Sequence, residues 1–193
     1  MRIVGGQWKR SKLPVADKPG LRPTPDRVRE TLFNWLGQNL AGWRVLDAFA
    51  GSGALGFEAA SRGAAEVLLL ERDPELVESL NSTRLRLKGE ASLRIERADA
   101  LTWMARHGAA AFELIFLDPP FGAGLADAAL AAALPLLAPG GFIYLEAPEP
   151  LAAVPPGLLP HRRARAGAVN FQLLQREGYT APAAPDASRR PAP

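Results

Sequence analysis

Apolar runs typical of buried strands alternate with segments of helical apolar spacing over most of the chain. The pattern predicts strands at 45–46, 67–71, 93–96, 113–117 and 141–146, and helices at 74–87, 100–106 and 125–137. Alternation of this kind predicts βαβ units, a mostly parallel sheet and helices on both of its faces. Ligands of such sheets bind outside the carboxyl ends of the strands.

The first 40 residues show a different pattern. Residues 2–15 alternate loosely around two glycines, which predicts a short β-hairpin, and 16–23 resemble a linker. Thr24 is expected to cap a helix that has Pro25 at its first position and Asp26 in its first turn. The apolar face of this helix, which is expected to belong to the core, contains Val28, Leu32, Trp35, Leu36 and Leu40.

The C-terminal part breaks the alternation at 155–157, a Pro-Pro-Gly sequence. Residues 168–175 alternate partially and suit one strand of a terminal antiparallel pair. From residue 181 the chain has no periodic apolar positions, so we expect a disordered tail. The expected boundaries are an N-terminal basic extension at 1–22, one folded domain at 23–178 and the tail at 179–193.

Length and composition exclude several classes of protein. The 193 residues suffice for one domain with a single core. The chain has no cysteine and only two histidines, which excludes disulfides and thiolate metal sites and argues against a zinc cluster. The longest apolar run, 128–138, contains Pro135 and is too short to span a bilayer, and the start lacks a signal-peptide apolar region. We therefore expect a soluble, cytoplasmic protein without metal.

Basic residues are concentrated at the start of the chain, although the formal net charge is only +3. The first 30 residues contain Asp17, Asp26 and Glu30 against a larger set of cations: Arg2, Lys9, Arg10, Lys12, Lys18, Arg22, Arg27 and Arg29. A basic arm of this kind suggests a phosphate-bearing partner, and a solvated segment with incidental charge is the alternative. His161, Arg162, Arg163 and Arg165 form a second small basic cluster.

The sequence VLDAFAGSGALG at 45–56 combines an apolar strand, an acid and a glycine-rich turn before a helix. The glycines allow a ligand to approach the backbone, and the free amides of the helix start face it. The spacing Gly51-x-Gly53-x-x-Gly56 also fits dinucleotide-binding loops. Asp47 distinguishes a dinucleotide from S-adenosylmethionine (AdoMet) as the ligand. It would repel the pyrophosphate of a dinucleotide but attract the ammonium and sulfonium groups of AdoMet. A strand-turn-helix without ligand is the remaining alternative.

Four acids, Asp47, Glu71, Asp99 and Asp118, fall at the predicted strand ends. Each of them could simply cap the following helix. Their common position at the ligand edge favours cofactor binding instead, with Asp47 at the amino group of the methionine part, Glu71 at the ribose hydroxyls and Asp99 at the adenine amine.

The tetrapeptide Asp118-Pro119-Pro120-Phe121 is the second candidate for chemistry. Its prolines fix the backbone and remove two amide donors, which leaves carbonyls and one carboxylate as acceptors. Asp118 and the Pro119 carbonyl could accept both hydrogens of an exocyclic nucleobase amine and orient its lone pair, while Phe121 stacks on the base. A rigid exit from a strand is the alternative.

These motifs resemble the RsmD type of bacterial 16S rRNA guanine-N2 methyltransferases, within the class I AdoMet-dependent methyltransferases. The resemblance covers residues 1 to about 178 and rests on MRIVGG at 1–6, LRPTPDRVRETLFNWL at 21–36, LDAFAGSGALG at 46–56 and LDPPF at 117–121. It implies a Rossmann-like α/β fold with a seven-stranded, mostly parallel sheet and an N-terminal β-hairpin. The activity it implies is methylation of N2 of one guanine, of the guanine 966 type, with S-adenosylhomocysteine as the product.

The resemblance also implies roles for individual residues. AdoMet would be held by Thr24, Asp47, Phe49, Gly51, Ser52, Gly53, Glu71, Arg72, Asp99, Ala100 and Asp118. The target base would be held by Asp118, Pro119, Pro120 and Phe121. Substrate RNA, in an assembled or assembling small ribosomal subunit, would contact Arg2, Lys9, Arg10, Lys12 and Arg22 of a monomeric enzyme.

Three other functions stay open at this point. A methyltransferase acting on adenine N6 in RNA or DNA usually has Asn-Pro-Pro-Tyr where this chain has Asp-Pro-Pro-Phe. A nicotinamide-dependent oxidoreductase would need a proton donor, and Tyr144, Tyr179, His107 and His161 form no motif for one. A non-catalytic AdoMet-binding or RNA-binding module would not need the intact tetrapeptide.

Overall fold

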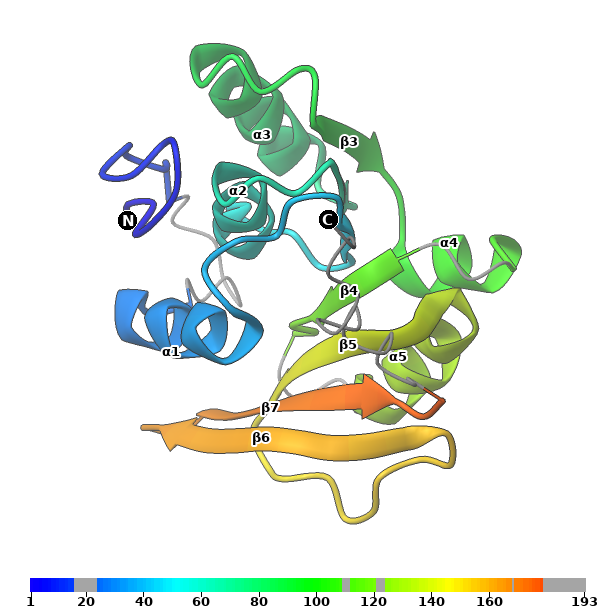
Figure 1. Ribbon diagram of the computed structural model, residues 1–193. Helices are drawn as coiled ribbons and strands as arrows, with labels where there is room; N and C mark the ends of the chain where they lie inside the picture. Colours follow the sequence, from blue (N-terminus) through cyan, green and yellow to red (C-terminus); the bar gives the residue numbers. More distant parts are fainter. Residues whose placement is uncertain (16–23, 109–111, 121–123, 168, 179–193) are drawn as a thin grey trace, which may run out of the picture.

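A single mixed sheet organises the computed structural model, which describes residues 1–15, 24–108, 112–120, 124–167 and 169–178. Within these ranges the strand order is β3-β2-β1-β4-β5-β7-β6 (Figure 1). The first five strands are parallel, whereas β7 runs antiparallel to both β5 and β6. Their bounds are β1 (Arg44–Asp47), β2 (Glu66–Glu71), β3 (Leu93–Arg97), β4 (Phe112–Leu117), β5 (Leu137–Ala147), β6 (Leu158–Ala166) and β7 (Val169–Arg176). The expected seven-stranded, mostly parallel sheet is confirmed.

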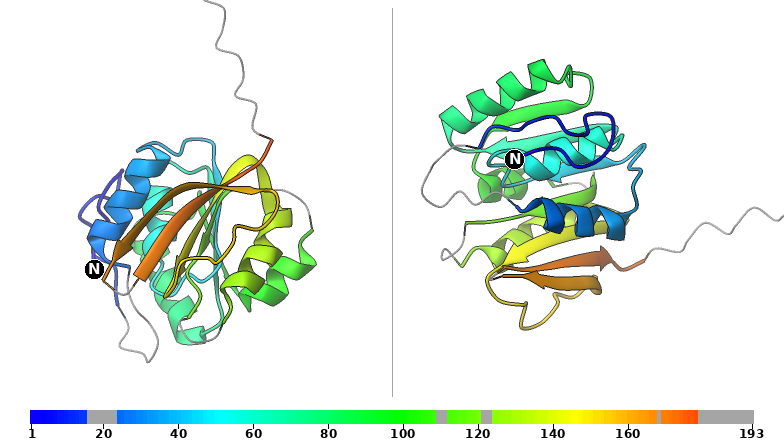
Figure 2. Two further views of the ribbon diagram at one scale, coloured as in Figure 1. Left: turned by 90° about the horizontal axis from the view of Figure 1, so that it is seen from below. Right: turned by 90° about the vertical axis from the view of Figure 1, so that its left-hand side faces the viewer.

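Helices cover both faces of the sheet and bury a separate apolar cluster on each (Figure 2). One face packs against α1 (Asp26–Leu36), α2 (Ala54–Ser61) and α3 (Pro74–Arg86). The other packs against α4 (Ala100–Arg106) and α5 (Ala126–Ala133), which continues into the 3₁₀ turn η1 (Leu134–Leu136). Strand alternation separates the clusters, because Val45 enters one and its neighbour Leu46 the other. Strands β1, β2 and β4 are covered on both faces and mainly apolar, which is why the sequence pattern located them.

Three sequence expectations about secondary structure need correction. Strand β6 was not predicted, because only its first residue is buried and its arginines are exposed, so it lacks a strand pattern. The predicted helix 125–137 ends at Ala133, since Pro135 allows only a 3₁₀ turn before β5 begins. Thr24 is not the cap of α1: the extended residue Pro25 precedes the helix and no side chain caps it.

Residues 1–15, here called the N-terminal loop, form a hairpin closed by an antiparallel bridge between Arg2 and Lys12. Its backbone bonds join Ile3 N–H to Ser11 C=O and Leu13 N–H to Met1 C=O. The loop packs along α2, and its tip is held at the end of that helix, where Ser61 accepts hydrogen bonds through its carbonyl and hydroxyl oxygens. The expected linker and tail lie in 16–23 and 179–193, outside the described residues.

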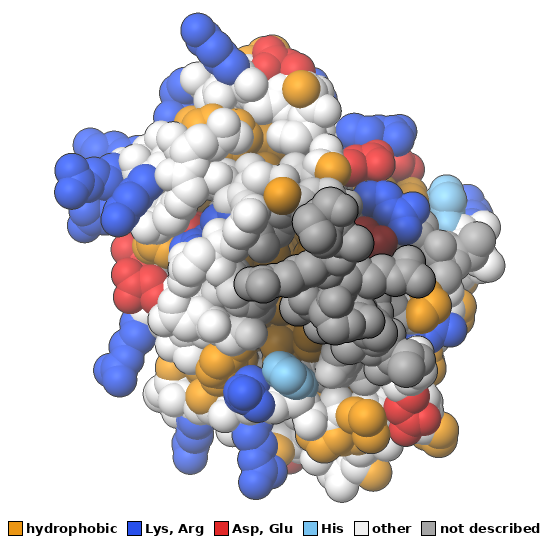
Figure 3. Space-filling view, viewed as in Figure 1, with side chains coloured by type: hydrophobic (Ala, Val, Ile, Leu, Met, Phe, Trp, Pro, Cys, Tyr) orange, Lys and Arg blue, Asp and Glu red, His pale blue; other side chains and the backbone are white. Residues whose placement is uncertain are grey.

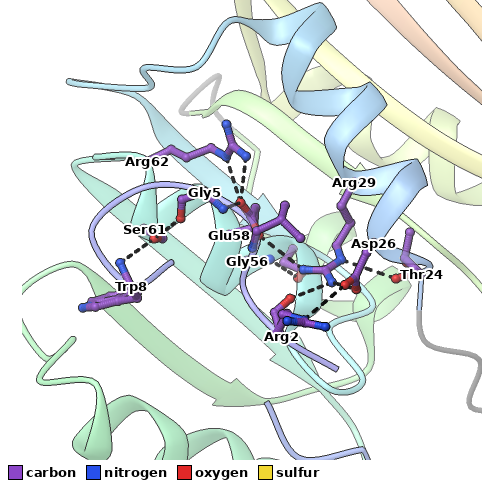
Figure 4. A network of polar contacts seen from close by, with 12 residues as sticks. Arg2, Gly5, Trp8, Thr24, Asp26, Arg29, Gly56, Glu58, Ser61 and Arg62 are labelled. Carbon is purple, nitrogen blue, oxygen red and sulfur yellow. Dashed lines mark hydrogen bonds and ion pairs between the residues drawn. The ribbon is translucent and has the colours of Figure 1, made fainter. Parts of the chain in front are cut away.

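A buried carboxylate, Glu58 of α2, fastens the N-terminal loop and α1 to the body of the protein (Figure 4). It accepts hydrogen bonds from the backbone amides of Val4 at 2.8 Å and Gly5 at 2.7 Å. It also pairs with the guanidinium groups of Arg29 at 3.2 Å and Arg62 at 2.9 Å. Both carboxylate oxygens are thereby satisfied inside the protein, as a buried charge requires.

Arg29 extends the same network from α1. Its guanidinium donates to the carbonyl oxygens of Arg2 at 2.7 Å and Thr24 at 3.3 Å, and it pairs with Asp26. Since this side chain is 0% exposed, Arg29 is not available as part of a basic arm for RNA. The sequence-based charge count assigned it to that arm because charge alone does not reveal burial.

We predict that Glu58→Ala lowers the free energy of unfolding by about 3 to 5 kcal/mol, because two buried arginines lose their anion. Urea denaturation followed by circular dichroism measures the change. The control is Arg94→Ala, which breaks an exposed ion pair with Glu66 and should cost at most about 1 kcal/mol. Equal losses in the two variants would contradict a central role for Glu58.

Candidate active site

A cleft of about 860 Å³ lies at the carboxyl edge of the sheet, the edge at which the five parallel strands end. The strand order reverses at β1, between β2 and β4, and such switch points are where doubly wound sheets bind ligands. Each parallel strand contributes an acid to the cleft within two residues of its end. These acids are Asp47, Glu71, Asp99, Asp118 and Glu146.

Asp47, the last residue of β1, is 2% exposed and accepts a hydrogen bond of 2.9 Å from the amide of Gly56. Burial raises the pKa of Asp47 to about 7, the Gly56 bond opposes this rise and the charge of Glu71 adds to it. A cation placed in the cleft would favour the ionised carboxylate.

The glycine-rich turn between β1 and α2 has a backbone that only glycine adopts easily. Gly51 and Gly53 have φ angles of 53° and 77°, and a Cβ on Gly53 would lie 2.5 Å from the ring of Phe57. The turn therefore lets α2 begin at the edge of the cleft with a tightly packed start. Of the glycines in this motif, Gly51 lines the cleft, whereas Gly53 supports the turn from behind.

Glu71 and Asp99 are both oriented by backbone amides. Glu71 accepts from the amides of Gly51 and Asp73, each at 2.9 Å, which leaves further lone pairs on both oxygens. Asp99 caps α4 by accepting from the Thr102 amide at 2.9 Å, and this bond lowers the pKa of Asp99. The helix-cap interpretation is thus correct for Asp99, and its position in the cleft is compatible with a second role.

Asp118 follows β4 directly and lies beside Glu146 of β5, since the two strands pair Leu117 with Leu145. Burial, followed by the charges of Glu146 and Asp47, raises the pKa of Asp118 well above its usual value. Pro119 and Pro120 line the cleft next to it. Phe121 lies outside the described residues.

Glu146 was missing from the sequence-based list of candidate residues, although the strand 141–146 was predicted to end at it. The signal that selected the other four acids, a position at the end of a parallel strand, applies equally to Glu146. Its side chain is 3% exposed, and burial raises its pKa. The Tyr144 hydroxyl donates to it at 2.8 Å, and this bond and the Thr24 side chain oppose the rise in its pKa.

The structure brings nearly all of the expected cofactor residues to one cleft. Those that line it are Thr24, Asp47, Phe49, Gly51, Ser52, Glu71, Arg72, Asp99, Ala100 and Asp118. No group of three or more His, Cys, Asp or Glu side chains suited to a metal ion was found in the ranges that the structure describes. In the same ranges no helix is long and apolar enough to cross a membrane.

The expected RNA-binding residues lie elsewhere. Lys9 and Arg10 are at the tip of the N-terminal loop, which is held at the end of α2, whereas α2 begins at the cleft. Arg2 lies nearer, 3.8 Å from Asp26 in the first turn of α1. Lys12 is exposed, and Arg22 is outside the described residues.

Comparison with known proteins identifies the family. The family model described as conserved hypothetical protein 95 matches residues 1–175. Ribosomal RNA small subunit methyltransferase D of Escherichia coli K12 is 44% identical over 92% of this chain and 90% of its own length. The protein of the same name from Haemophilus influenzae is 38% identical over 91% and 93%. The chain belongs to the RsmD family.

A solved structure from the comparisons has the same fold. The putative methyltransferase yhhF from Escherichia coli superposes with a TM-score of 0.82 at 41% identity, over 93% of this chain and 99% of that chain. The seven-stranded sheet is therefore the Rossmann-like class I methyltransferase fold, with β7 antiparallel to its neighbours.

The raised pKa of Asp47 predicts how stability depends on pH in the ligand-free protein. Between about pH 4 and 7 the folded protein keeps a proton that the unfolded chain has lost, so the free energy of unfolding falls as the pH rises through this window. From pH 5 to 8 we expect Asp47 to contribute about 2 to 3 kcal/mol of this loss.

Urea denaturation of the wild type and Asp47→Asn at both pH values tests this expectation, because the amide cannot ionise. The loss from pH 5 to 8 should be smaller in Asp47→Asn, whereas Asp127→Asn, at an exposed acid of α5, should behave like the wild type. The same loss in all three proteins would show that Asp47 does not titrate in this range.

Proposed function

We propose that this protein transfers a methyl group from AdoMet to N2 of one guanine of 16S rRNA in the small ribosomal subunit. The observation that carries the proposal is one cleft that holds an acid suited to a cationic cofactor, Asp47, next to the fixed acceptors Asp118 and Pro119. The names of the relatives from Escherichia coli and Haemophilus influenzae support the class of substrate. Methylation of adenine N6 is not favoured by any of these observations.

The side chains of the cleft fit AdoMet. Asp47 is a buried acid that gains a partner in the ammonium group, and Glu71 has free lone pairs for two ribose hydroxyls. Asp99, at the neighbouring strand end, suits the adenine amine, and Gly51 leaves room for close approach. The bound cofactor would supply an electrophilic methyl group.

Asp118 and Pro119 would prepare the nucleophile. An exocyclic amine is a poor nucleophile because its lone pair is drawn into the ring. If the Asp118 carboxylate and the Pro119 carbonyl accept its two hydrogens, the lone pair is directed toward the methyl donor. Asp118 can then take the proton that leaves nitrogen after alkylation, and its raised pKa favours this transfer.

RNA would contact two basic surfaces, one on the N-terminal loop, whose tip lies at the end of α2 that is remote from the cleft, and one along β6. Lys and Arg side chains gather beside the N-terminal loop and along β6 (Figure 3). Since β6 is parallel to β5, its end with Arg163 and Arg165 lies at the carboxyl edge, and neither arginine pairs with an acid among the described residues. The loop tip, with Lys9 and Arg10, would contact RNA that flanks the target. Activity on ribosomal RNA would place the protein in the cytoplasm, and we expect it to act as a monomer.

The proposal is tested by methyl transfer from labelled AdoMet to unmethylated small subunits and to free 16S rRNA, with nucleosides identified by mass spectrometry. We expect N2-methylguanosine. Methyladenosine, or no transfer to either substrate, would overturn the proposed substrate.

We predict that Asp118→Ala lowers kcat by at least about 100-fold, because the target amine loses an orienting acceptor. AdoMet affinity in calorimetry should change little, because the proposed mechanism uses Asp118 to orient the amine of the base, although Asp118 also lines the cleft with the expected cofactor residues. Glu78→Ala, at an exposed acid of α3, is the control and should retain full activity. Loss of cofactor binding in Asp118→Ala would contradict the assigned role.

We predict that replacing Arg2, Lys9, Arg10 and Lys12 by Gln weakens RNA binding and flattens its salt dependence. Each lost phosphate contact should reduce the slope of log affinity against log salt by about 0.7 to 0.9. Filter binding between about 50 and 200 mM salt measures the slope. Arg94→Gln with Arg106→Gln, which removes charge elsewhere, should leave it unchanged, and an unchanged slope in the loop variant would exclude the N-terminal loop from the interface.

A further inference from the structure

Glu146 lies where two hollows of the protein meet. The main cleft adjoins a second hollow of about 430 Å³, and both are lined by Pro119, Pro120, Leu125 and Glu146. Asp118 lines only the main cleft, whereas Pro119, Pro120 and Glu146 form the boundary that the two hollows share. Glu146 is thus exposed to a group in either hollow.

The second hollow suits a flat, largely apolar group that carries hydrogen-bond donors. Its walls are mostly prolines, alanines and leucines of the segments 124–127 and 147–153. Besides Glu146, its acids are Asp127 and Glu149, both exposed at its rim. A nucleobase presents apolar faces to such walls and polar groups only along its edges.

Hydrogen bonds fix the orientation of the Glu146 carboxylate without using its full capacity. The Tyr144 hydroxyl donates to Oε1, and the Tyr144 ring is held edge-on against Phe116. The Tyr144 bond occupies one of about four acceptor positions, and the Thr24 side chain lies near the carboxylate. The remaining lone pairs are available to a donor in either hollow.

Glu146 has no positive partner among the residues that the structure describes. Its neighbours in the fold are two hydroxyl groups and the acid Asp118. By contrast, Glu58, the other buried glutamate of the described ranges, pairs with two arginines. A carboxylate kept buried without a cation suits a role in which a ligand supplies the missing donors.

We propose that Glu146 is a second base-reading carboxylate, which accepts the N1–H of the target guanine while Asp118 accepts from its N2 amine. The inference rests on the proposed function and adds the feature that selects the base. Guanine presents N1–H and N2–H₂ side by side, whereas adenine presents a bare nitrogen at N1, which a carboxylate repels. Neighbouring acids at the ends of β4 and β5 match the two adjacent donors of guanine.

The probe that tests this inference is 2-aminopurine, which keeps the N2 amine but has an acceptor at N1. It is introduced at the methylated position of 16S rRNA by ligation. The RNA is used either free or in reconstituted subunits, according to the form in which the wild type methylates the guanine. The wild type should prefer guanine by at least about 100-fold in kcat/KM, since it reads a donor at N1. In Glu146→Gln the amide can donate to the bare nitrogen, so this ratio should fall at least about tenfold.

Two further variants make the result specific. Glu149→Gln is the same change in the same hollow at an exposed side chain, and it should leave the ratio unchanged. Glu146→Asp withdraws the carboxylate by one methylene and should also lower the ratio; it provides the test if Glu146→Gln does not fold by thermal melting. If a folded Glu146 variant preferred guanine over 2-aminopurine as strongly as the wild type, Glu146 would have only a structural role. No transfer to guanine by the wild type would overturn the proposed function, and this inference with it.

Discussion

The position of the glycine-rich turn at the cleft depends on the buried carboxylate of Glu58. Helix α2, which carries Glu58, is buried along its whole length and begins directly after the glycine turn. A short helix cannot hold its own geometry, so its position is set by what it packs against. Glu58 supplies that constraint by joining Arg29 of α1 and the backbone of the N-terminal loop to α2. The loop at residues 1–15 is therefore part of the fold, whatever it contributes to RNA binding.

The same network reaches the cleft through Thr24. The carbonyl of Thr24 accepts from Arg29, while its side chain lowers the pKa of Glu146 on the other side. Thr24 thus connects a fully compensated buried charge to an uncompensated one. Glu58 stabilises the fold because its partners are built in, whereas Asp47, Asp118 and Glu146 lie together without cations of their own among the described residues. Burying three neighbouring acids without cations lowers the stability of the ligand-free protein. Such a cost is expected of a site whose ligands bring positive charge and hydrogen-bond donors.

The sequence was sufficient for the elements whose environment is uniform. Strands β1, β2 and β4 are buried on both faces, so their apolar runs located them. The sequence was not sufficient where tertiary contacts determine the structure. Strand β6 is held mainly by its pairing with β7, and its own side chains carry no signal. Arginine is usually a surface residue, yet Arg29 is buried because the N-terminal loop, α2 and the segment before α1 all contact it. Glu146 shows a different limit. Position at the end of a parallel strand is a signal that also applies to it, but as the last residue of a predicted strand it stands out less than an acid that follows one.

The strand order assigns the two ligands to different parts of the carboxyl edge of the sheet. Acids at the ends of β1, β2 and β3 lie on the side suited to the cofactor, and those of β4 and β5 lie on the side suited to the base. Beyond β5 the sheet continues with β7 and then β6, so its edge is extended only on the side of the base. That extension brings Arg163 and Arg165 to the same edge by register with Gln172 and Asn170. A substrate much larger than a nucleotide needs contact area next to its target base and none next to the cofactor. The antiparallel pair at this end of the sheet supplies that area on the one side where RNA can use it.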